Sequence, residues 1–241
     1  MPGHRVRRFY LLLMAADMKD GVEQGKVLVI GGGRFGCLAV ERLGGRVSLV
    51  IEPHPSPELS ALGVPVKAEP GEIAGPRILA ASSAQTWVVP AVPRHFLGDW
   101  LQAMLSPVKI NTVFPPEACV PQAPSIMQGK RGEIYLSLAD FMCPDDCPEP
   151  AEICTVTGQP RGEPMFARLA AIACPQWHTG VLRSRQLAPG VGGLKLAEMR
   201  DLKNKIVNKG GSWLIGTACR CHGVLQGLIM DRAGEGAGCL I

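Results

Sequence analysis

The segment from Lys26 to Glu52 constrains the fold of this chain more than any other part of its sequence. A continuous apolar run, Lys26–Ile30, is followed at once by the glycine-rich stretch GGGRFG and then by a short helical pattern. A second apolar run, Val47–Ile51, ends directly before Glu52. Apolar runs without alternation are typical of parallel strands that are buried on both faces. The segment therefore predicts a strand, a glycine loop, a helix and a second parallel strand, in that order.

The glycine loop has the spacing that a bound dinucleotide requires. Gly31, Gly33 and Gly36 form the pattern G-x-G-x-x-G between a predicted strand and a predicted helix. The first glycine permits a tight turn, the second lets the backbone approach a pyrophosphate, and the third lets the helix pack closely on the strand. The phosphates would lie against the main-chain amides at the positive end of the helix. The residues expected to bind the cofactor are Gly31, Gly32, Gly33, Arg34, Phe35, Gly36 and Glu52.

Glu52 predicts which dinucleotide is bound. It follows Gly31 by 21 positions, at the end of the second strand, where a carboxylate can accept hydrogen bonds from the adenosine ribose. The same carboxylate would repel a phosphate group on that ribose. The sequence therefore favours NAD over NADP, and a glycine-rich turn that binds nothing is the alternative.

Two families resemble this part of the chain. The loop GGGRFG is similar to that of the nucleotide-binding domains of TrkA-type potassium-uptake regulators. The longer passage VLVIGGGRFGCLAVERL, continued by VSLVIEPHPSPELSALGVPV and EPGEIAG, resembles the NAD-dependent dehydrogenase module of siroheme synthases, a precorrin-2 dehydrogenase. The resemblance covers roughly residues 25–85 and implies a Rossmann NAD(P)-binding domain.

Strand and helix patterns continue to alternate beyond this unit. Further strands are expected at Val64–Ala68, Ile78–Ala80, Trp87–Val89, Glu133–Phe141, Trp177–Arg183 and Ser212–Thr217. Further helices are expected at Pro93–Leu105, Pro164–Ile172, Leu194–Asn208 and Gly223–Asp231. Together these patterns predict an α/β fold with a Rossmann-like, doubly wound and mostly parallel sheet, interrupted by a long irregular insertion rich in proline and cysteine.

The same patterns suggest how the chain is divided. Residues 1–24 are interpreted as an N-terminal extension that need not be ordered. Residues 25–110 are expected to form a dinucleotide-binding half, and residues 111–241 a second α/β half that carries a cysteine loop. The proline-rich stretch Ser106–Gly132 is interpreted as a long connection or as the seam between the two halves.

Two groups of cysteines follow predicted strands. One lies in the loop 143–154, which several prolines stiffen, and the other lies at 219–222 beside a histidine. Because ligands gather outside the carboxyl ends of parallel strands, we expect both groups and the glycine loop to meet at one edge of the sheet. Soft thiolates suit zinc or an iron–sulfur cluster, while buried free thiols and a reversible disulfide are the alternatives. The predicted metal ligands are Cys143, Cys147, Cys154, Cys219, Cys221 and His222.

Charge and hydropathy exclude several classes of function. The formal net charge is +4, and acidic and basic residues are interleaved. Arg161, Arg183 and Arg185 are interpreted as solvated surface charges, with recognition of an anionic substrate as the alternative. Nucleic-acid binding is therefore not expected. No apolar run approaches the roughly 20 residues of a membrane helix, so no membrane span is expected. An odd number of cysteines beside a nucleotide-binding pattern favours metal or redox chemistry in a reducing cytoplasm over a secreted disulfide framework.

Three functional hypotheses follow from these features. The first is an NAD-binding redox protein, and so an NAD-dependent oxidoreductase, with a cysteine-ligated metal or iron–sulfur centre near the cofactor. Such a protein would act on a small-molecule substrate or a redox partner protein. The second is a TrkA-type module that senses NAD or NADH without turnover and either forms a homo-oligomer or sits beside a membrane protein. In the third, zinc only orders the cysteine loop. The sequence identifies no catalytic residue under any of the three.

Overall fold

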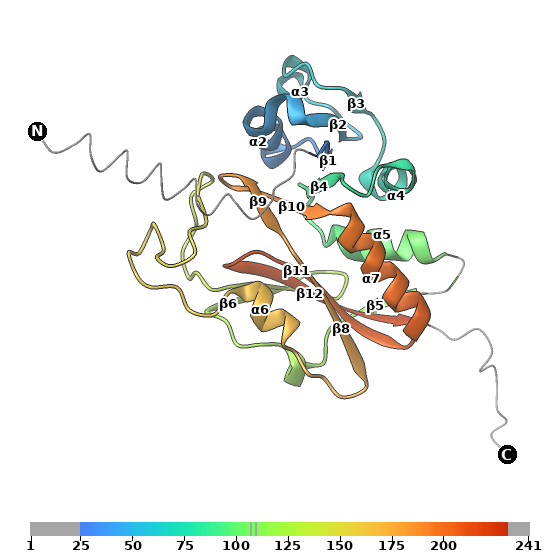
Figure 1. Cartoon of the computed structure of the whole chain (residues 1–241), viewed down its shortest axis with the longest axis vertical. Helices are drawn as coiled ribbons and strands as arrows, with labels where there is room; N and C mark the ends of the chain where they lie inside the picture. The colour runs from blue at the N-terminus through green and yellow to red at the C-terminus, as the bar shows by residue number, and fades with distance from the viewer. Residues whose placement is uncertain (1–24, 107, 109, 231–241) are drawn as a thin grey trace, which may run out of the picture.

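The computed structural model describes residues 25–106, 108 and 110–230 and shows a mixed α/β protein with two β-sheets (Figure 1). The strands are β1 Val27–Ile30, β2 Val47–Ile51, β3 Val66–Lys67, β4 Trp87–Pro90, β5 Ile110–Val113, β6 Ser125–Gln128, β7 Glu133–Ser137, β8 Trp177–Arg183, β9 Arg185–Ala188, β10 Val191–Lys195, β11 Ser212–Ala218 and β12 His222–Met230. The helices are α2 Arg34–Leu43, α3 Pro57–Ala61, α4 Gly71–Ala81, α5 Phe96–Leu105, α6 Met165–Ala170 and α7 Leu196–Lys209, with short 3-10 helices η1 Gly44–Arg46 and η2 Glu117–Cys119.

The first sheet has the strand order β3-β2-β1-β4-β10-β9. Its first four strands are parallel, and β10 and β9 extend it beyond β4 through antiparallel pairs. Along β1, Leu28 and Ile30 join the core that contains α5 and α7, while Val27 and Val29 join the core under α2. Both faces of β1 are buried, as its apolar run predicted.

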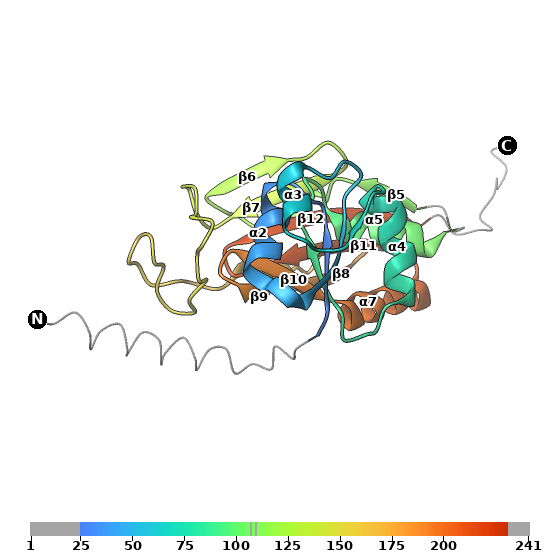
Figure 2. The same cartoon turned by 90° about the horizontal axis from the view of Figure 1, so that it is seen from above.

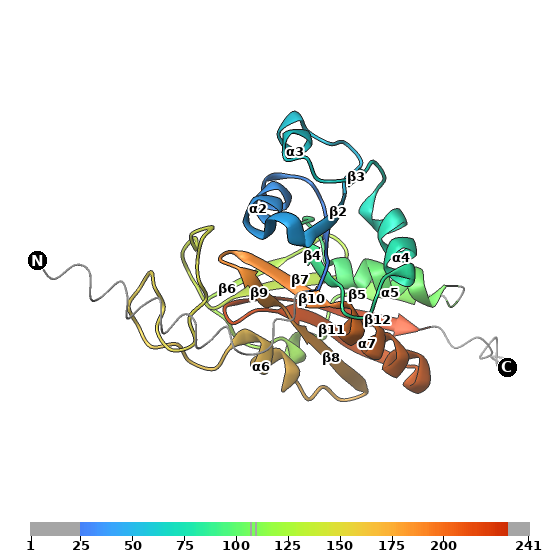
Figure 3. The same ribbon diagram turned by 45° about the horizontal axis from the view of Figure 1, so that its top comes forward.

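The second sheet has the order β6-β7-β12-β11-β8 and is mostly antiparallel. Its central strand β12 is antiparallel to β7 and β11, and β5 pairs with its far end. Only β8 pairs in parallel, with β11. Helices α5 and α7 lie between the two sheets, and α6 covers the opposite face of the second sheet with Met165 and Leu169 (Figures 1 and 3).

One stretch of chain passes from the second sheet into the first. Strand β8 ends at Arg183 and β9 begins at Arg185, so that only Ser184 separates them. The N–H of Ser184 donates to the carbonyl of Ala218 at 2.8 Å, which holds the crossing point against the end of β11. The two sheets are therefore joined directly rather than through a linker.

Most of the predicted elements are present, but two were assigned the wrong type. The segment expected as a helix at Gly223–Asp231 is strand β12, described as far as Met230. Its apolar residues have helical spacing, yet pairing with β7 and β11 on either side decides its conformation. The strand expected at Ile78–Ala80 is part of helix α4. A short apolar run does not distinguish a buried strand from a turn of a buried helix.

The larger arrangement also differs from the prediction. The mixed α/β class is confirmed, but two sheets are present where one was expected, and antiparallel pairs dominate the second. The stretch Ser106–Gly132 is not a plain connection, because it contains β5, η2 and β6. The predicted extension at residues 1–24 lies outside the described residues. None of the helices in the described ranges is long and apolar enough to cross a membrane.

Candidate functional site

The glycine loop joins β1 to α2 at the carboxyl end of β1. Gly31 has a φ of 100°, which favours glycine, and its N–H donates to the carbonyl of Ile51 at 2.8 Å. A Cβ on Gly36 would lie 2.1 Å from the carbonyl oxygen of Gly31, so a larger residue could not start the helix this close to the turn. Gly33 is the N-cap of α2, and no side chain caps the helix there. Beyond its own adjacent chain, nothing lies within 4 Å of where a Gly33 Cβ would be, so the loop is open above this residue.

Glu52 lies beside this loop, directly after β2. One of its carboxylate oxygens accepts a hydrogen bond from the N–H of Gly32 at 2.7 Å, and the other accepts from the N–H of His54 at 2.9 Å. The carboxylate is thereby fixed next to the glycine loop. The two other predicted cofactor contacts, Arg34 and Phe35, are exposed on the first turn of α2.

A charged cluster near the loop after β4 was missed by sequence analysis. Arg94 contacts Glu72 of α4 at 3.1 Å and Asp99 of α5 at 3.5 Å, and Arg131 contacts Asp99 at 2.9 Å. The residues of this cluster come from separate elements, so no local sequence pattern predicts the cluster. The adjacent His95 is buried, and burial lowers the pKa of its imidazole to about 4, so that this ring is neutral at pH 7.

The two cysteine segments meet at one edge of the second sheet. Strands β7 and β11 are both antiparallel to β12, so they run in the same direction and end at the same edge. The cysteine loop follows β7, and the turn 219–221 follows β11. The N–H of Leu138, directly after β7, donates to the carbonyl of Cys221 at 2.8 Å. The N–H of Arg220 donates to the carboxylate of Glu149 in the cysteine loop, which joins the two segments. This is the convergence that the strand-end rule predicts for them.

Four of the predicted ligands line one cavity at this edge. The cavity has a volume of about 300 Å³ and is lined by Cys143, Cys147, Cys154, Cys221 and Arg161, among others. Arg161 was interpreted from the sequence as a surface charge, but its Nη1 donates to the Sγ atom of Cys221. We call this space the cysteine cavity.

The other two predicted ligands lie beside the cysteine cavity rather than in its lining. The Nδ1 atom of His222 is 3.7 Å from the Sγ atom of Cys219, and its Nε2 atom is 3.7 Å from the Sγ atom of Cys143. Burial, together with the carboxylate of Glu149, raises the pKa of the Cys219 thiol to about 12. Cys219 is therefore a protonated, unreactive thiol at neutral pH in this conformation.

The thiols inside the cavity have different environments. Burial and the neighbouring thiols raise the pKa of Cys143, whereas main-chain amides at Thr157 and Val156 lower the pKa of Cys154. Burial raises the pKa of Cys221, and the Arg161 guanidinium opposes that effect. Across the described residues, no group of three or more His, Cys, Asp or Glu side chains is arranged to hold a metal ion. The metal centre expected from the sequence therefore stays a prediction.

The cysteine loop also contacts the first sheet, on the side of the glycine loop. The carboxylate of Asp145 forms an ion pair with Arg34, and the Asp145 carbonyl accepts from Nη1 of Arg42 at 2.6 Å. The carbonyl of Cys147 accepts from the N–H of Gly190 at 3.1 Å, in the turn between β9 and β10. In Figures 1 and 2 the loop between β7 and α6, drawn in yellow, extends on the side of α2 and β9. The cysteine loop thus contacts α2, next to the glycine loop. The expectation that the glycine loop and both cysteine groups meet at one edge of one sheet is wrong, because the glycine loop follows a strand of the first sheet and the cysteine groups follow strands of the second.

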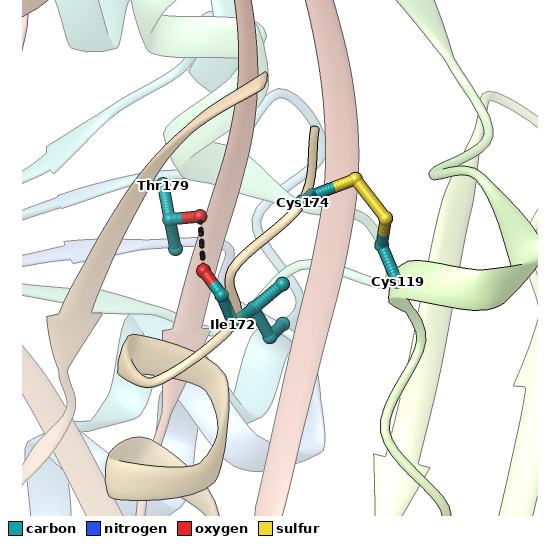
Figure 4. Close-up of a disulfide and its surroundings, with 4 residues drawn as sticks. All are labelled: Cys119, Ile172, Cys174 and Thr179. Carbon is teal, nitrogen blue, oxygen red and sulfur yellow. Dashed lines mark hydrogen bonds between the residues drawn. A yellow bond between two sulfur atoms is a disulfide. The ribbon is translucent and has the colours of Figure 1, made fainter. Parts of the chain in front are cut away.

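A disulfide that the sequence did not reveal joins Cys119 to Cys174. Its Cα atoms are 5.6 Å apart, and the bond links η2 to the segment between α6 and β8 (Figure 4). Both cysteines are buried in the core under α6, where the hydroxyl of Thr179 also donates to the carbonyl of Ile172 at 2.9 Å. Disulfides persist mainly in oxidising surroundings, so the cytoplasmic location stays a prediction.

These features define an α/β protein that combines a glycine loop with a cysteine cavity. Residues 95–231 match the family AF_1314_C, which is described as "Uncharacterized protein, C-terminal domain". The match covers more than half of the chain, and the chain belongs to this family. The matched segment includes the cysteine cavity but begins after the glycine loop.

A relative in Archaeoglobus fulgidus, also described as an uncharacterized protein, is 31% identical over 145 residues. The alignment covers 59% of this chain and 64% of the relative, so the chain spans just under two thirds of the length of that protein. No solved structure matches the chain.

Proposed function

We propose that this protein binds NAD at the glycine loop and takes part in a redox reaction. The observation that carries the proposal is the geometry of that loop. Gly36 packs against the carbonyl of Gly31, and Gly31 packs against Ala91 after β4, while the space above Gly33 is open at the uncapped start of α2. A pyrophosphate in this space would receive main-chain N–H groups and the positive end of a ten-residue helix.

The strands around the loop support the same proposal. The parallel order β3-β2-β1-β4, with α2 on one face and α4 and α5 on the other, supports the proposal that this part of the chain is a Rossmann-like half. In such sheets ligands bind outside the carboxyl ends of the strands, where the chain order reverses. The reversal here lies between β1 and β4, beside the glycine loop. Both families that the sequence resembles would bind a dinucleotide at this place.

The residues present suit NAD. The carboxylate of Glu52 is already held by Gly32 and His54, so it is placed to accept hydrogen bonds from ribose hydroxyls without further ordering. Bound NAD would supply hydride transfer at its nicotinamide. The chain would hold the pyrophosphate at the loop and orient the ribose through Glu52. Titration calorimetry with NAD and with NADP tests the proposal, which predicts tighter binding of NAD. Absence of binding heat with both would contradict it.

Replacing Glu52 by glutamine should weaken the preference for NAD. The amide oxygen of the substituted side chain can still accept one of the two main-chain hydrogen bonds, but the negative charge that repels a ribose phosphate is gone. We expect the ratio of NADP to NAD affinity to rise about tenfold, which corresponds to about 1.4 kcal/mol. The measurement is calorimetric titration of wild type and E52Q with both cofactors. A wild-type protein that already prefers NADP would show that Glu52 has another role.

A second candidate function, sensing of NAD or NADH without turnover, is favoured by the contact between the two loops. Arg34 is the first residue of α2, directly after Gly33 of the glycine loop, and its partner Asp145 belongs to the cysteine loop. A bound pyrophosphate would compete with Asp145 for this guanidinium. Cofactor binding would then release the cysteine loop from α2. A partner protein that contacts this loop would sense the change in its position.

Replacing Asp145 by asparagine should raise the affinity for NAD. The change frees Arg34 for the pyrophosphate and removes a negative charge from the neighbourhood of the loop. Exposed ion pairs contribute about 0.2–1 kcal/mol, so we expect a gain of up to about fivefold. The comparison should be made at low and at high salt, because screening reduces the gain. Equal affinities of wild type and D145N at low salt would show that the two loops are not coupled.

A further inference from the structure

Four of the six free cysteines among the described residues line the cysteine cavity. Cys143, Cys147 and Cys154 come from the loop after β7, and Cys221 comes from the turn between β11 and β12. The cavity of about 300 Å³ is far larger than the space of about 10–15 Å³ that a single water needs. Four cysteines thus line a space with room for an occupant of several atoms.

Arg161 gives this cavity a positive wall. Its Nη1 atom donates to Cys221, and its Nε and Nη2 atoms are buried without a hydrogen-bond partner in the part of the chain that the structure describes. Burying a donor without a partner costs free energy. An occupant that carries negative charge and accepts hydrogen bonds would remove this cost, and a cluster with four thiolate ligands is such an occupant.

Although these thiols are not arranged around a single metal ion, we propose that Cys143, Cys147, Cys154 and Cys221, which line one cavity, hold a larger occupant, a [4Fe–4S] cluster, with each thiolate bound to one iron. Ligation by four cysteines is the usual arrangement for these clusters, and hydrogen bonds to the sulfur atoms set their reduction potential. Arg161 is a positioning residue in this site, since it holds the Cys221 sulfur and balances charge. The thiols lose their protons when the cluster binds. Cys219 and His222, which the sequence also suggested as ligands, lie outside the cavity and are not part of the site.

The rigidity and the anchoring of the cysteine loop suit a loop that supplies cluster ligands. It is stiffened by Pro144, Pro148 and Pro150, so less conformational entropy is lost when its three thiolates converge. It is also anchored at both sides, to the turn between β9 and β10 through Cys147 and to the turn 219–221 through Glu149, which accepts from the N–H of Arg220. The role of the cluster in electron transfer rests on the proposed redox function, whereas its binding does not.

The test is anaerobic reconstitution of the full chain with ferrous iron, ferric iron and sulfide, because a cluster that can still be reduced contains both iron valences. We expect about four iron and four sulfide per chain, as in a [4Fe–4S] centre, together with broad visible absorption that is bleached on reduction. Cys147→Ser and Cys221→Ser should each lose most of the iron. The matched controls are Cys37→Ser, on α2, and Cys219→Ser, next to the cavity, and both should keep the wild-type load. Loss of the cluster in C219S, or its retention in C147S, would overturn the proposed ligand set.

A second measurement does not depend on the folding of the variants. Alkylation of reconstituted and iron-free wild-type protein, followed by peptide mass spectrometry, should show protection by the cluster at Cys143, Cys147, Cys154 and Cys221. The reactivity of Cys37 should not change. Stoichiometric zinc binding by the same thiols with no cluster formed would overturn the proposal.

The test separates this inference from the proposed function. Gly33→Val should take up the full amount of iron although it no longer binds NAD. Protein that binds NAD but cannot be loaded with iron and sulfide would overturn the cluster and leave the NAD site standing.

Discussion

Gly33→Val is expected to lower the affinity for NAD at least about 100-fold, or about 2.7 kcal/mol, without unfolding the protein. Gly33 has φ −70° and ψ −166°, an extended conformation that valine adopts without strain. A new side chain would meet no other part of the protein within 4 Å at its Cβ. It would instead occupy the space through which the backbone approaches the pyrophosphate. Titration calorimetry measures the loss, and thermal unfolding checks the fold.

Gly45→Val is the matched control for this prediction. Gly45 lies in η1, beyond the far end of α2, and a Cβ there would also meet nothing within 4 Å. The same change of residue type is thus made at the opposite end of the same helix. We expect G45V to bind NAD as the wild type does. Unchanged NAD affinity in G33V would remove the proposed dinucleotide site.

Removing the disulfide should produce the largest loss of stability. The bond closes a loop with a sequence separation of 55, for which the chain-entropy treatment gives about 4 kcal/mol, within a usual range of about 2–5 kcal/mol. The double variant Cys119→Ala, Cys174→Ala should therefore show a much lower midpoint in urea. Alanine is preferred to serine because both positions are buried, and a serine hydroxyl there would lack a partner.

Reductant supplies the control for the disulfide. Adding a thiol reductant should lower the urea midpoint of the wild type towards that of the double variant and should leave the variant unchanged. The slope of the unfolding transition reports whether the unfolded state has become less compact. Equal midpoints for oxidised wild type and variant would show that the bond contributes nothing to stability in solution.

The sequence predicted those parts of the fold whose signals are local. The apolar runs of β1 and β2 and the glycine loop between them are contiguous, so their order could be read directly. Strand β12 was mistaken for a helix, because its neighbours β7 and β11 are distant in sequence and only their pairing reveals a strand. The division of the strands into two sheets depends on the same long-range pairing and has no local signature.

The candidate site shows the same limit. The meeting of the two cysteine segments was predictable, since both follow strands that end at one edge. The burial of Arg161 against Cys221 was not, because a single arginine in a loop gives no sign of what will cover it. The pairing of Cys119 with Cys174 could not be predicted either, since cysteine connectivity cannot be deduced from sequence alone.

The crossing at Ser184 makes the two sheets parts of one indivisible unit. A fragment that ended at residue 110 would keep the parallel strands of the first sheet but would lose β10, whose Leu194 pairs with Val88 of β4. The newly exposed edge of β4 would present unpaired main-chain N–H and C=O groups. Because such groups can pair with strands of other chains, the fragment would tend to aggregate. A fragment 95–231, although it corresponds to the family match, would carry β9 and β10 with no β4 to pair with. Cutting the gene between the glycine loop and the cysteine cavity would therefore yield two unstable products, and the two sites must be studied in one polypeptide.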